Sequence, residues 1–225
     1  MARRGRQQEL KFRTHGGVRK GAGRKPNVPG APGVAHKTRS PLAHRHPVHV
    51  TLRVHRDVPN LRRRALLLPL TNALRDGRDR FGFRLCHYVI MGNHLHLVAE
   101  AQDERALARG LQGLCIRLAR CVNRELARRG RVFGDRYHAH ILRTPTEVHR
   151  ALGYVLLNLR KHAAERSAVA PRGIDAFSSG RWFAPWNPGP NATPAPPDDA
   201  PVVAPRQWLL REGWTRAGTI PSPRA

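Results

Sequence analysis

Residues 81–100 read FGFRLCHYVIMGNHLHLVAE, and this stretch decides the fold. The segments 81–91 and 94–100 are apolar runs of strand length, and each is rich in residues typical of buried strands. Gly92 and Asn93 separate them, and this pair of residue types is common in tight turns. The stretch therefore predicts two antiparallel strands joined as a hairpin, although the order Gly-Asn leaves the turn type open.

The second strand of this hairpin carries two histidines one residue apart, His94 and His96, here called the hairpin histidines. Because successive side chains of a strand point to opposite faces, the two imidazoles lie on one face and the leucines beside them lie on the other. With 13 histidines in the chain, about one His-x-His is expected by chance, so the pattern alone is weak. A second copy occurs at His138 and His140.

The remaining periodicities predict a complete small fold. The expected elements are a strand at 46–54, a helix at 59–79 that Pro69 kinks or splits, the two hairpin strands, a helix at 104–129, a strand at 131–142 and a helix at 145–164. The last helix opens with Thr144, Pro145 and Glu147, which is the pattern of a capping box. The order β-α-β-β-α-β predicts an α+β, ferredoxin-like split βαβ arrangement with an antiparallel sheet. Two helices would cover one face, and the last helix would be free to pack on the other.

The charge balance indicates a polyanionic partner. The chain has 225 residues with 41 Lys and Arg against 15 Asp and Glu, a formal charge of +26. Such a charge repels itself unless it is neutralised, and nucleic acid is the obvious counterpart. A bias of the genome toward arginine codons is the alternative explanation.

Two regions concentrate this charge. Residues 1–45 hold 12 Lys and Arg and one acid, and they are expected to be a basic disordered tail. The helix at 104–129 carries arginines beside an apolar stripe. The candidate DNA-binding residues in these two regions are Arg19, Lys20, Arg24, Lys25, Arg105, Arg109 and Arg117. Arg150 and Lys161, further along the chain, are candidates as well. A solubilising tail and a solvated helix face remain the alternatives.

The ends of the chain suggest a cytoplasmic protein with a C-terminal extension. The N-terminus has no apolar leader, no run of 18 apolar residues occurs, and the three cysteines form no C-x-x-C pair, so we expect no membrane span and a reducing compartment. Residues 166–225 are proline-rich and expected to lie outside the domain formed by 46–165. Within them, 207–218 could form a short docking helix.

One ridge of the last helix complements the hairpin histidines. Arg150, Tyr154, Asn158 and Lys161 are spaced four, four and three residues apart, so they share a stripe separate from the apolar face. Two imidazoles and the Asn158 amide would give a divalent cation three neutral ligands and leave positions for phosphate oxygens. Tyr154 could then attack the phosphorus, provided that the cation with Arg150 or Lys161 favours the phenolate.

This joint pattern, NHLHLV followed by YVLLN, resembles the single-tyrosine HUH transposases, and especially their REP-associated tyrosine transposase branch. By that resemblance His94 and His96 match the family's His-hydrophobe-His, Tyr154 matches its nucleophile and Asn158 matches its amide ligand. Two further family-like stretches are RYHA (136–139) and DAFSSGRWF (175–183). The resemblance covers residues 46–185, and where many relatives have Asn-Pro this chain has Asn158-Leu159.

The resemblance implies a metal-dependent DNA transesterase that acts in the bacterial cytoplasm at the nucleoid. It would use Mg²⁺ or Mn²⁺ to cleave and rejoin single-stranded DNA, often beside a hairpin, through a 5′-phosphotyrosine that leaves a free 3′-hydroxyl. The alternative is a non-catalytic or regulatory DNA-binding protein of the same fold. Tyr137 is a rival nucleophile. A single nucleophilic tyrosine per chain makes two-strand chemistry awkward for a monomer, so a homodimer is expected. The sequence leaves open whether this tyrosine acts in its own subunit or in the partner.

Overall fold

The computed structural model describes residues 41–134, 136–160, 173–186 and 196–223. These residues belong to one compact unit that begins at Pro41. Five of the predicted DNA-binding residues lie outside the described part of the chain: Arg19, Lys20, Arg24, Lys25 and Lys161. The predicted disordered tail also lies outside it, apart from residues 41–45, of which Leu42 is buried in the core.

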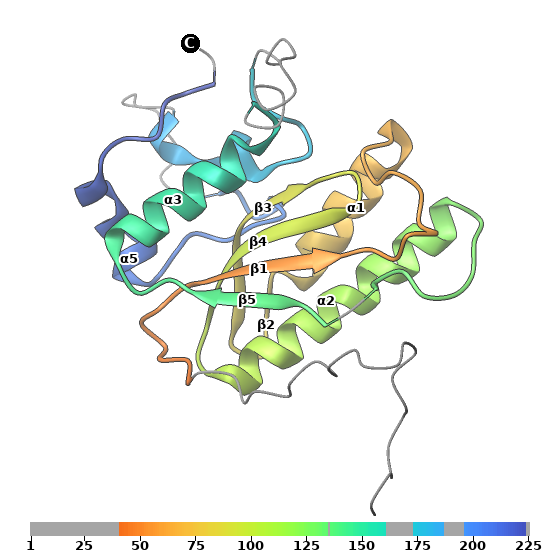
Figure 1. Cartoon of the computed structure of the whole chain (residues 1–225), viewed down its shortest axis with the longest axis horizontal. Helices are drawn as coiled ribbons and strands as arrows, with labels where there is room; N and C mark the ends of the chain where they lie inside the picture. Colours follow the sequence, from red (N-terminus) through yellow and green to blue (C-terminus); the bar gives the residue numbers. More distant parts are fainter. Residues whose placement is uncertain (1–40, 135, 161–172, 187–195, 224–225) are drawn as a thin grey trace, which may run out of the picture. The chain divides into compact units, whose positions relative to one another are not determined.

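An antiparallel sheet forms the centre of this unit (Figure 1). Its strands are β1 (Val48–Arg53), β2 (Asp79–Arg80), β3 (Phe83–Ile90), β4 (His94–Ala101) and β5 (His138–Ile141), in the spatial order β2-β3-β4-β1-β5. Both β1 and β3 pair antiparallel with β4, so β4 lies between two strands that the chain connects through a helix. This arrangement confirms the predicted α+β class and the split βαβ order. The short edge strand β2 was not predicted.

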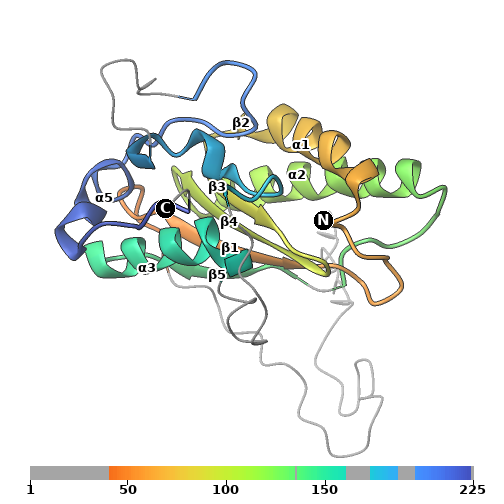
Figure 2. The same cartoon turned by 90° about the horizontal axis from the view of Figure 1, so that it is seen from above.

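Two helices cover one face of the sheet, as Figure 2 shows. They are α1 (Arg64–Gly77) and α2 (Glu104–Glu125), and they pack against each other as well as against the strands. The strand residues buried in this first core are Val48, Val50, Leu52, Phe83, Leu85, Tyr88, Ile90, Leu95, Leu97, Ala99 and Ala101. The leucines of β4 thus face α1 and α2, so the hairpin histidines face the opposite side.

A second core lies on that opposite face, beneath α3 (Pro145–Leu156). The C-terminal segment contributes to it through η2 (Ala184–Trp186), α5 (Trp208–Arg211) and η3 (Gly213–Ala217). The buried residues that meet here include Cys86, Val89, Val98, Val148, Leu152, Val155, Phe183, Trp186 and Trp214. Trp182 of η1 (Ser179–Trp182) packs against the first core instead. The described parts of the C-terminal segment are therefore packed on the same unit as the sheet.

The helix at 64–77 runs through Pro69 without being split. Proline removes one backbone N–H and crowds the carbonyl four residues earlier, which here belongs to Ala65 in the first helical turn. The missing hydrogen bond and the crowding at this carbonyl are therefore confined to the start of the helix. The free energy gained by burying Leu66, Leu70 and Leu74 in the first core outweighs the cost of the proline.

The last helix is shorter than predicted. It begins as expected, with the Thr144 side chain accepting from the Glu147 N–H and Glu147 closing the capping box. However, α3 ends at Leu156, and Leu157 departs from helical geometry with φ −113° and ψ 12° before residues 158–160 turn again as helix. In a regular helix, two residues that are two positions apart point to nearly opposite sides, yet Leu156 and Asn158 are both buried. The chain is therefore packed on more than one side here, and this packing outweighs the helical period.

The turn that joins β3 to β4 is held from outside the hairpin. The Leu61 N–H donates to the Gly92 carbonyl oxygen at 2.8 Å, and the Val54 N–H donates to the Asn93 carbonyl oxygen at 3.0 Å. These bonds satisfy the exposed carbonyl groups of the turn. They also fix the start of β4, where the hairpin histidines begin.

The contact between α2 and β3 gives a stability test. A Cβ added at Gly110 of α2 would clash with the Cβ and ring of Phe83, which is fully buried. Gly110→Ala should therefore lower the free energy of unfolding by about 1–3 kcal/mol in urea denaturation. Gly113→Ala, in the same helix but beside only the flexible end of Arg117, is the matched control. It should be neutral or slightly stabilising, and equal losses from both variants would contradict this packing.

Candidate active site

Tyr154 of α3 lies directly over the hairpin histidines. Its hydroxyl oxygen is 3.3 Å from Nε2 of His96, although the two residues are 58 positions apart in the chain. The two rings meet edge to face, with centroids 4.8 Å apart and an interplanar angle of 85°. The side chain of Tyr154 is half-buried and borders an open groove, so the hydroxyl lies at the edge of the second core.

The two hairpin histidines lie against each other at the start of β4. Their ring centroids are 4.7 Å apart with an interplanar angle of 84°. Nδ1 of His94 lies 2.6 Å from Oδ1 of Asn93, an oxygen that can only accept, so Nδ1 carries the proton in this contact. In neutral His94 the lone pair is then on the other nitrogen, Nε2.

The neighbouring strand β1 supports His96. Thr51 is the cross-strand partner of His96, and its Oγ1 lies 3.2 Å from Nδ1 of His96. Nε2 of His49 lies at the same distance from that nitrogen. Burial, followed by the neighbouring His140 and His138, lowers the pKa of His49 to about 4, so His49 is uncharged at neutral pH. An uncharged His49 or Thr51 can accept from Nδ1–H of His96, which leaves Nε2 of His96 with the lone pair that faces Tyr154.

The sequence did not identify His49 and Thr51 as part of the site. Its alternation did put both on the outward face of the strand at 46–54. What it lacked was the register that sets Thr51 opposite His96. A polar pair on a predicted neighbouring strand, facing the same side as the histidines, is the signal that could have found them.

The second histidine pair lies on the same face of the sheet, on the far side of β1. His138 is the cross-strand partner of Thr51 and His140 that of His49. Both are exposed, and Nε2 of His140 lies 3.5 Å from a carboxylate oxygen of Glu147. Tyr137 instead packs against the first core, so it does not share the face on which Tyr154 lies.

Asn158 lies just beyond the end of α3 and is buried. It is fully inaccessible, and within the described residues neither Oδ1 nor Nδ2 of its side chain has a hydrogen-bond partner. A buried amide left unpaired costs free energy, so a missing ligand on Asn158 is a physical explanation for it. The described ranges contain no group of three His, Cys, Asp or Glu side chains arranged to hold a metal. The imidazole nitrogens of His94 and His96 and the amide oxygen of Asn158 are donor types that a divalent cation accepts.

A groove of about 860 Å³ lies beside Tyr154 along α3. Its lining includes His49, His140, Arg150 and Leu157, so one wall is apolar and a cation lies at its edge. Arg150 is exposed and one helical turn before Tyr154. A phosphate that reached Tyr154 would therefore come close to this guanidinium.

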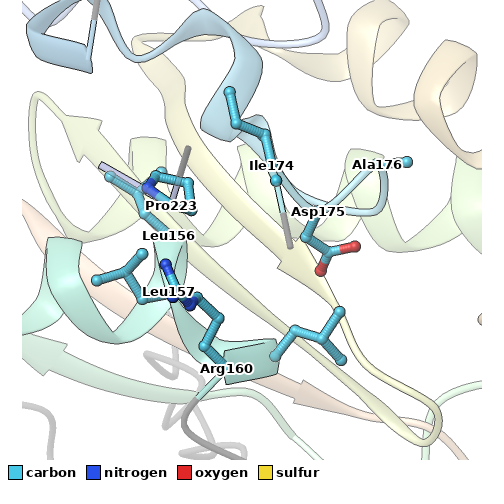
Figure 3. A pocket seen from close by; sticks show the side chains of 9 residues that line it. Leu156, Leu157, Arg160, Ile174, Asp175, Ala176 and Pro223 are labelled. Carbon is cyan, nitrogen blue, oxygen red and sulfur yellow. The ribbon is translucent and has the colours of Figure 1, made fainter. Parts of the chain in front are cut away.

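A smaller pocket of about 210 Å³ lies beyond the end of α3. Figure 3 shows Leu156, Leu157 and Arg160 on one side of it and Ile174 and Asp175 on the other. The Asp175 carboxylate is already engaged, because the Arg62 guanidinium donates to both of its oxygens at 2.7 and 2.9 Å. This pocket is the space between the end of α3 and the segment around Asp175, which the Arg62–Asp175 ion pair holds in place.

The predicted arginine stripe lies away from the site. Arg105, Arg109 and Arg117 belong to α2, which covers the face of the sheet opposite to α3. Arg105 and Arg109 are exposed, whereas Arg117 donates to the Gly113 carbonyl oxygen of its own helix at 2.9 Å. Any DNA contact of this stripe is therefore separate from the Tyr154 groove.

No helix in the described ranges is long and apolar enough to cross a membrane.

Comparisons with known proteins found similarity at the level of solved structures. No protein-family model matches the chain. No curated protein matches its sequence. Among solved structures, one similar chain is that of the REP-associated tyrosine transposase bound to a REP hairpin, with 13% sequence identity and a TM-score of 0.45. The match covers 57% of this chain and 74% of that chain.

The orphaned amide of Asn158 gives a test of the donor set. Asn158→Leu removes two unsatisfied polar groups, so it should raise the free energy of unfolding in EDTA by about 1–3 kcal/mol. If Asn158 is a ligand, the same variant should lose most of the rise in Tm that Mn²⁺ gives the unmodified protein. Differential scanning fluorimetry with and without Mn²⁺ measures both effects.

Asn72→Leu, on α1 across the sheet, is the control for this comparison and should keep the Mn²⁺ response. A full Mn²⁺ response in Asn158→Leu would remove Asn158 from the ligand set.

Proposed function

We propose that this protein is a metal-dependent DNA transesterase of the transposase type, which cleaves and rejoins single-stranded DNA through a 5′-phosphotyrosine. The observation that carries the proposal is the 3.3 Å contact between the Tyr154 hydroxyl and Nε2 of His96. It brings a nucleophile from α3 to the histidine pair of β4. A protein that only bound DNA would need neither group at this position.

Tyr154 is the proposed nucleophile. Attack by its Oη on a phosphodiester forms the phosphorus–Oη bond and breaks the bond from phosphorus to the 3′ oxygen. The phenolic proton goes to solvent, and the departing oxygen takes up a proton to become the free 3′-hydroxyl. The phosphotyrosine conserves the bond energy, so the reverse attack by a 3′-hydroxyl rejoins the strand.

The residues proposed to hold the cation, Mg²⁺ or Mn²⁺, are His94, His96 and Asn158. When bound, the cation supplies Lewis-acid polarisation of the phosphate. Imidazole ligands suit Mn²⁺ better than Mg²⁺. Thr51 and His49 serve by keeping the proton of His96 on Nδ1, which puts the lone pair on Nε2, the nitrogen that would bind the cation.

The groove along α3 is the proposed path of the DNA strand next to Tyr154. Arg150 would pair with a phosphate there, and the apolar wall would contact sugar or base. The formal charge of +26 supports a polyanionic substrate. The proposal includes a homodimer, in which each chain would contribute its own Tyr154.

The second candidate is a regulatory DNA-binding protein of the same fold. Binding alone would explain the charge and the arginines of α2. It would not explain why a tyrosine hydroxyl of α3 meets two imidazoles at the start of β4, or why the buried Asn158 amide has no hydrogen-bond partner among the described residues. The two candidates differ in one observable, a covalent protein–DNA adduct.

Tyr154→Phe should abolish the covalent adduct and leave DNA affinity nearly unchanged, because the ring still packs while the nucleophilic oxygen is lost. The measurement is incubation with end-labelled single-stranded DNA and Mn²⁺, followed by a denaturing gel. Tyr137→Phe is the matched control and should form adduct normally. If Tyr154→Phe still forms adduct and Tyr137→Phe does not, the nucleophile is Tyr137. Absence of adduct in the unmodified protein favours the regulatory candidate.

Replacing either hairpin histidine should remove metal binding and cleavage together. His94→Ala and His96→Ala each delete one proposed ligand, whereas His138→Ala alters the second pair, across β1, and should keep the metal. Titration calorimetry with Mn²⁺ decides between the pairs. Loss of binding in the His138 variant alone would reverse the assignment.

A further inference from the structure

A basic pocket with an exposed tryptophan lies at the other end of α3 from the candidate active site. It has a volume of about 700 Å³, and Pro145, the first residue of α3, is part of its wall. Four arginines also line it: Arg45, Arg143, Arg206 and Arg216. None of the described residues that form its wall is acidic.

Trp208 gives this pocket an aromatic surface. It is 43% exposed, whereas Trp214 and Trp186 of the same C-terminal segment are buried. The chain around it is held firmly, because the next residues, Leu209 and Leu210, are buried in the second core. A large ring that is fixed at its base and open to solvent is typical of a binding surface.

The backbone that leads into Trp208 is anchored to the sheet. The backbone N–H groups of Arg206 and Gln207 donate to the buried Glu100 carboxylate of β4 at 2.9 and 2.8 Å. This carboxylate is thereby occupied and lies beneath the pocket wall. The pocket is therefore a preformed surface, whose cations and ring need little reorganisation to receive a ligand.

The electrostatic field in the pocket is positive. Burial lowers the pKa of His46, and the charges of Arg45 and Arg143 lower it in addition, while Glu147 opposes them. The Arg216 guanidinium lies 4.8 Å above the Trp208 ring, so one cation is already positioned beside the aromatic surface. Four guanidinium groups around one exposed ring match a ligand with several phosphates and an unstacked base.

We propose that this pocket, here called the Trp208 pocket, binds a single-stranded segment of the DNA substrate, with a base stacked on Trp208 and phosphates paired with Arg45, Arg143, Arg206 and Arg216. The naming of DNA rests on the proposed function. A single strand is required because the bases of a duplex are stacked on each other and cannot reach a side-chain ring.

The position of the pocket makes it a second contact on the same strand. Pro145 and Tyr154 lie nine residues apart on α3, which is about 13 Å along a helix axis. A strand whose phosphate lies at Tyr154 can therefore reach Trp208 within a few nucleotides, along the groove that includes Arg150. The Trp208 pocket would thus set the strand's position before cleavage.

Equilibrium binding of the full chain to a fluorescein-labelled oligo-dT, in EDTA so that no metal-dependent chemistry occurs, tests the proposal. Trp208→Ala should weaken binding about tenfold or more, since stacking contributes about 1–3 kcal/mol per base. Trp208→Phe, which keeps a stacking ring, should recover most of that loss. Arg206→Gln and Arg216→Gln should each reduce the slope of log K against log salt by about 0.7.

Arg211→Gln is the matched control, because Arg211 lies on α5 but pairs with Glu212 at 2.7 Å and does not line the pocket. Its salt slope should stay unchanged. Unaltered affinity in Trp208→Ala, equal binding of blunt duplex, or equally strong competition by an acidic peptide would each overturn the proposal. The readout is independent of Tyr154 adduct formation, so loss of the proposed catalytic function and loss of this site are separate results.

Discussion

The pairing of β1 with β4 in a single register is the constraint on which the rest of the structure depends. Both faces of β4 are largely buried, one by the helix pair and the other by α3, so a slip of one residue would exchange Leu95 and Leu97 with the hairpin histidines. The free energy of burying those leucines fixes the register. The same register puts Thr51 and His49 beside His96, so the support of the candidate site is a by-product of core packing.

The placement of α3 follows from the second core. Val148, Leu152 and Val155 are buried against the sheet and the C-terminal segment, and Tyr154 then lies at the edge of that contact. The C-terminal segment matters as much as the helix, because Glu100 of β4 anchors it through two backbone N–H groups. The candidate nucleophile is therefore positioned by residues up to Ile220, well beyond the stretch that carries the sequence motifs.

The charge of the protein is distributed over separate surfaces. The arginines of α2 lie on one side of the sheet, whereas Arg150 and the cations of the Trp208 pocket lie on the side of α3. Within the second group, Arg150 borders the candidate active site, and the cations of the Trp208 pocket lie around an exposed aromatic ring at the other end of α3. A long-range attraction for polyanions needs only the total charge, but the position of a strand relative to Tyr154 depends on this local group.

The sequence by itself determined the features that depend on local periodicity and local hydrogen bonds. These are the alternation in 94–100 that puts His94 and His96 on one face, the capping box at Thr144 and the β-α-β-β-α-β order. Only the tertiary structure decided that Thr51 meets His96, that α3 ends at Leu156, and that the Asn158 amide is buried without a hydrogen-bond partner among the described residues. Those outcomes arise from strand register and from packing between residues far apart in the chain. Such contacts leave no fixed spacing in the sequence, so no period could reveal them.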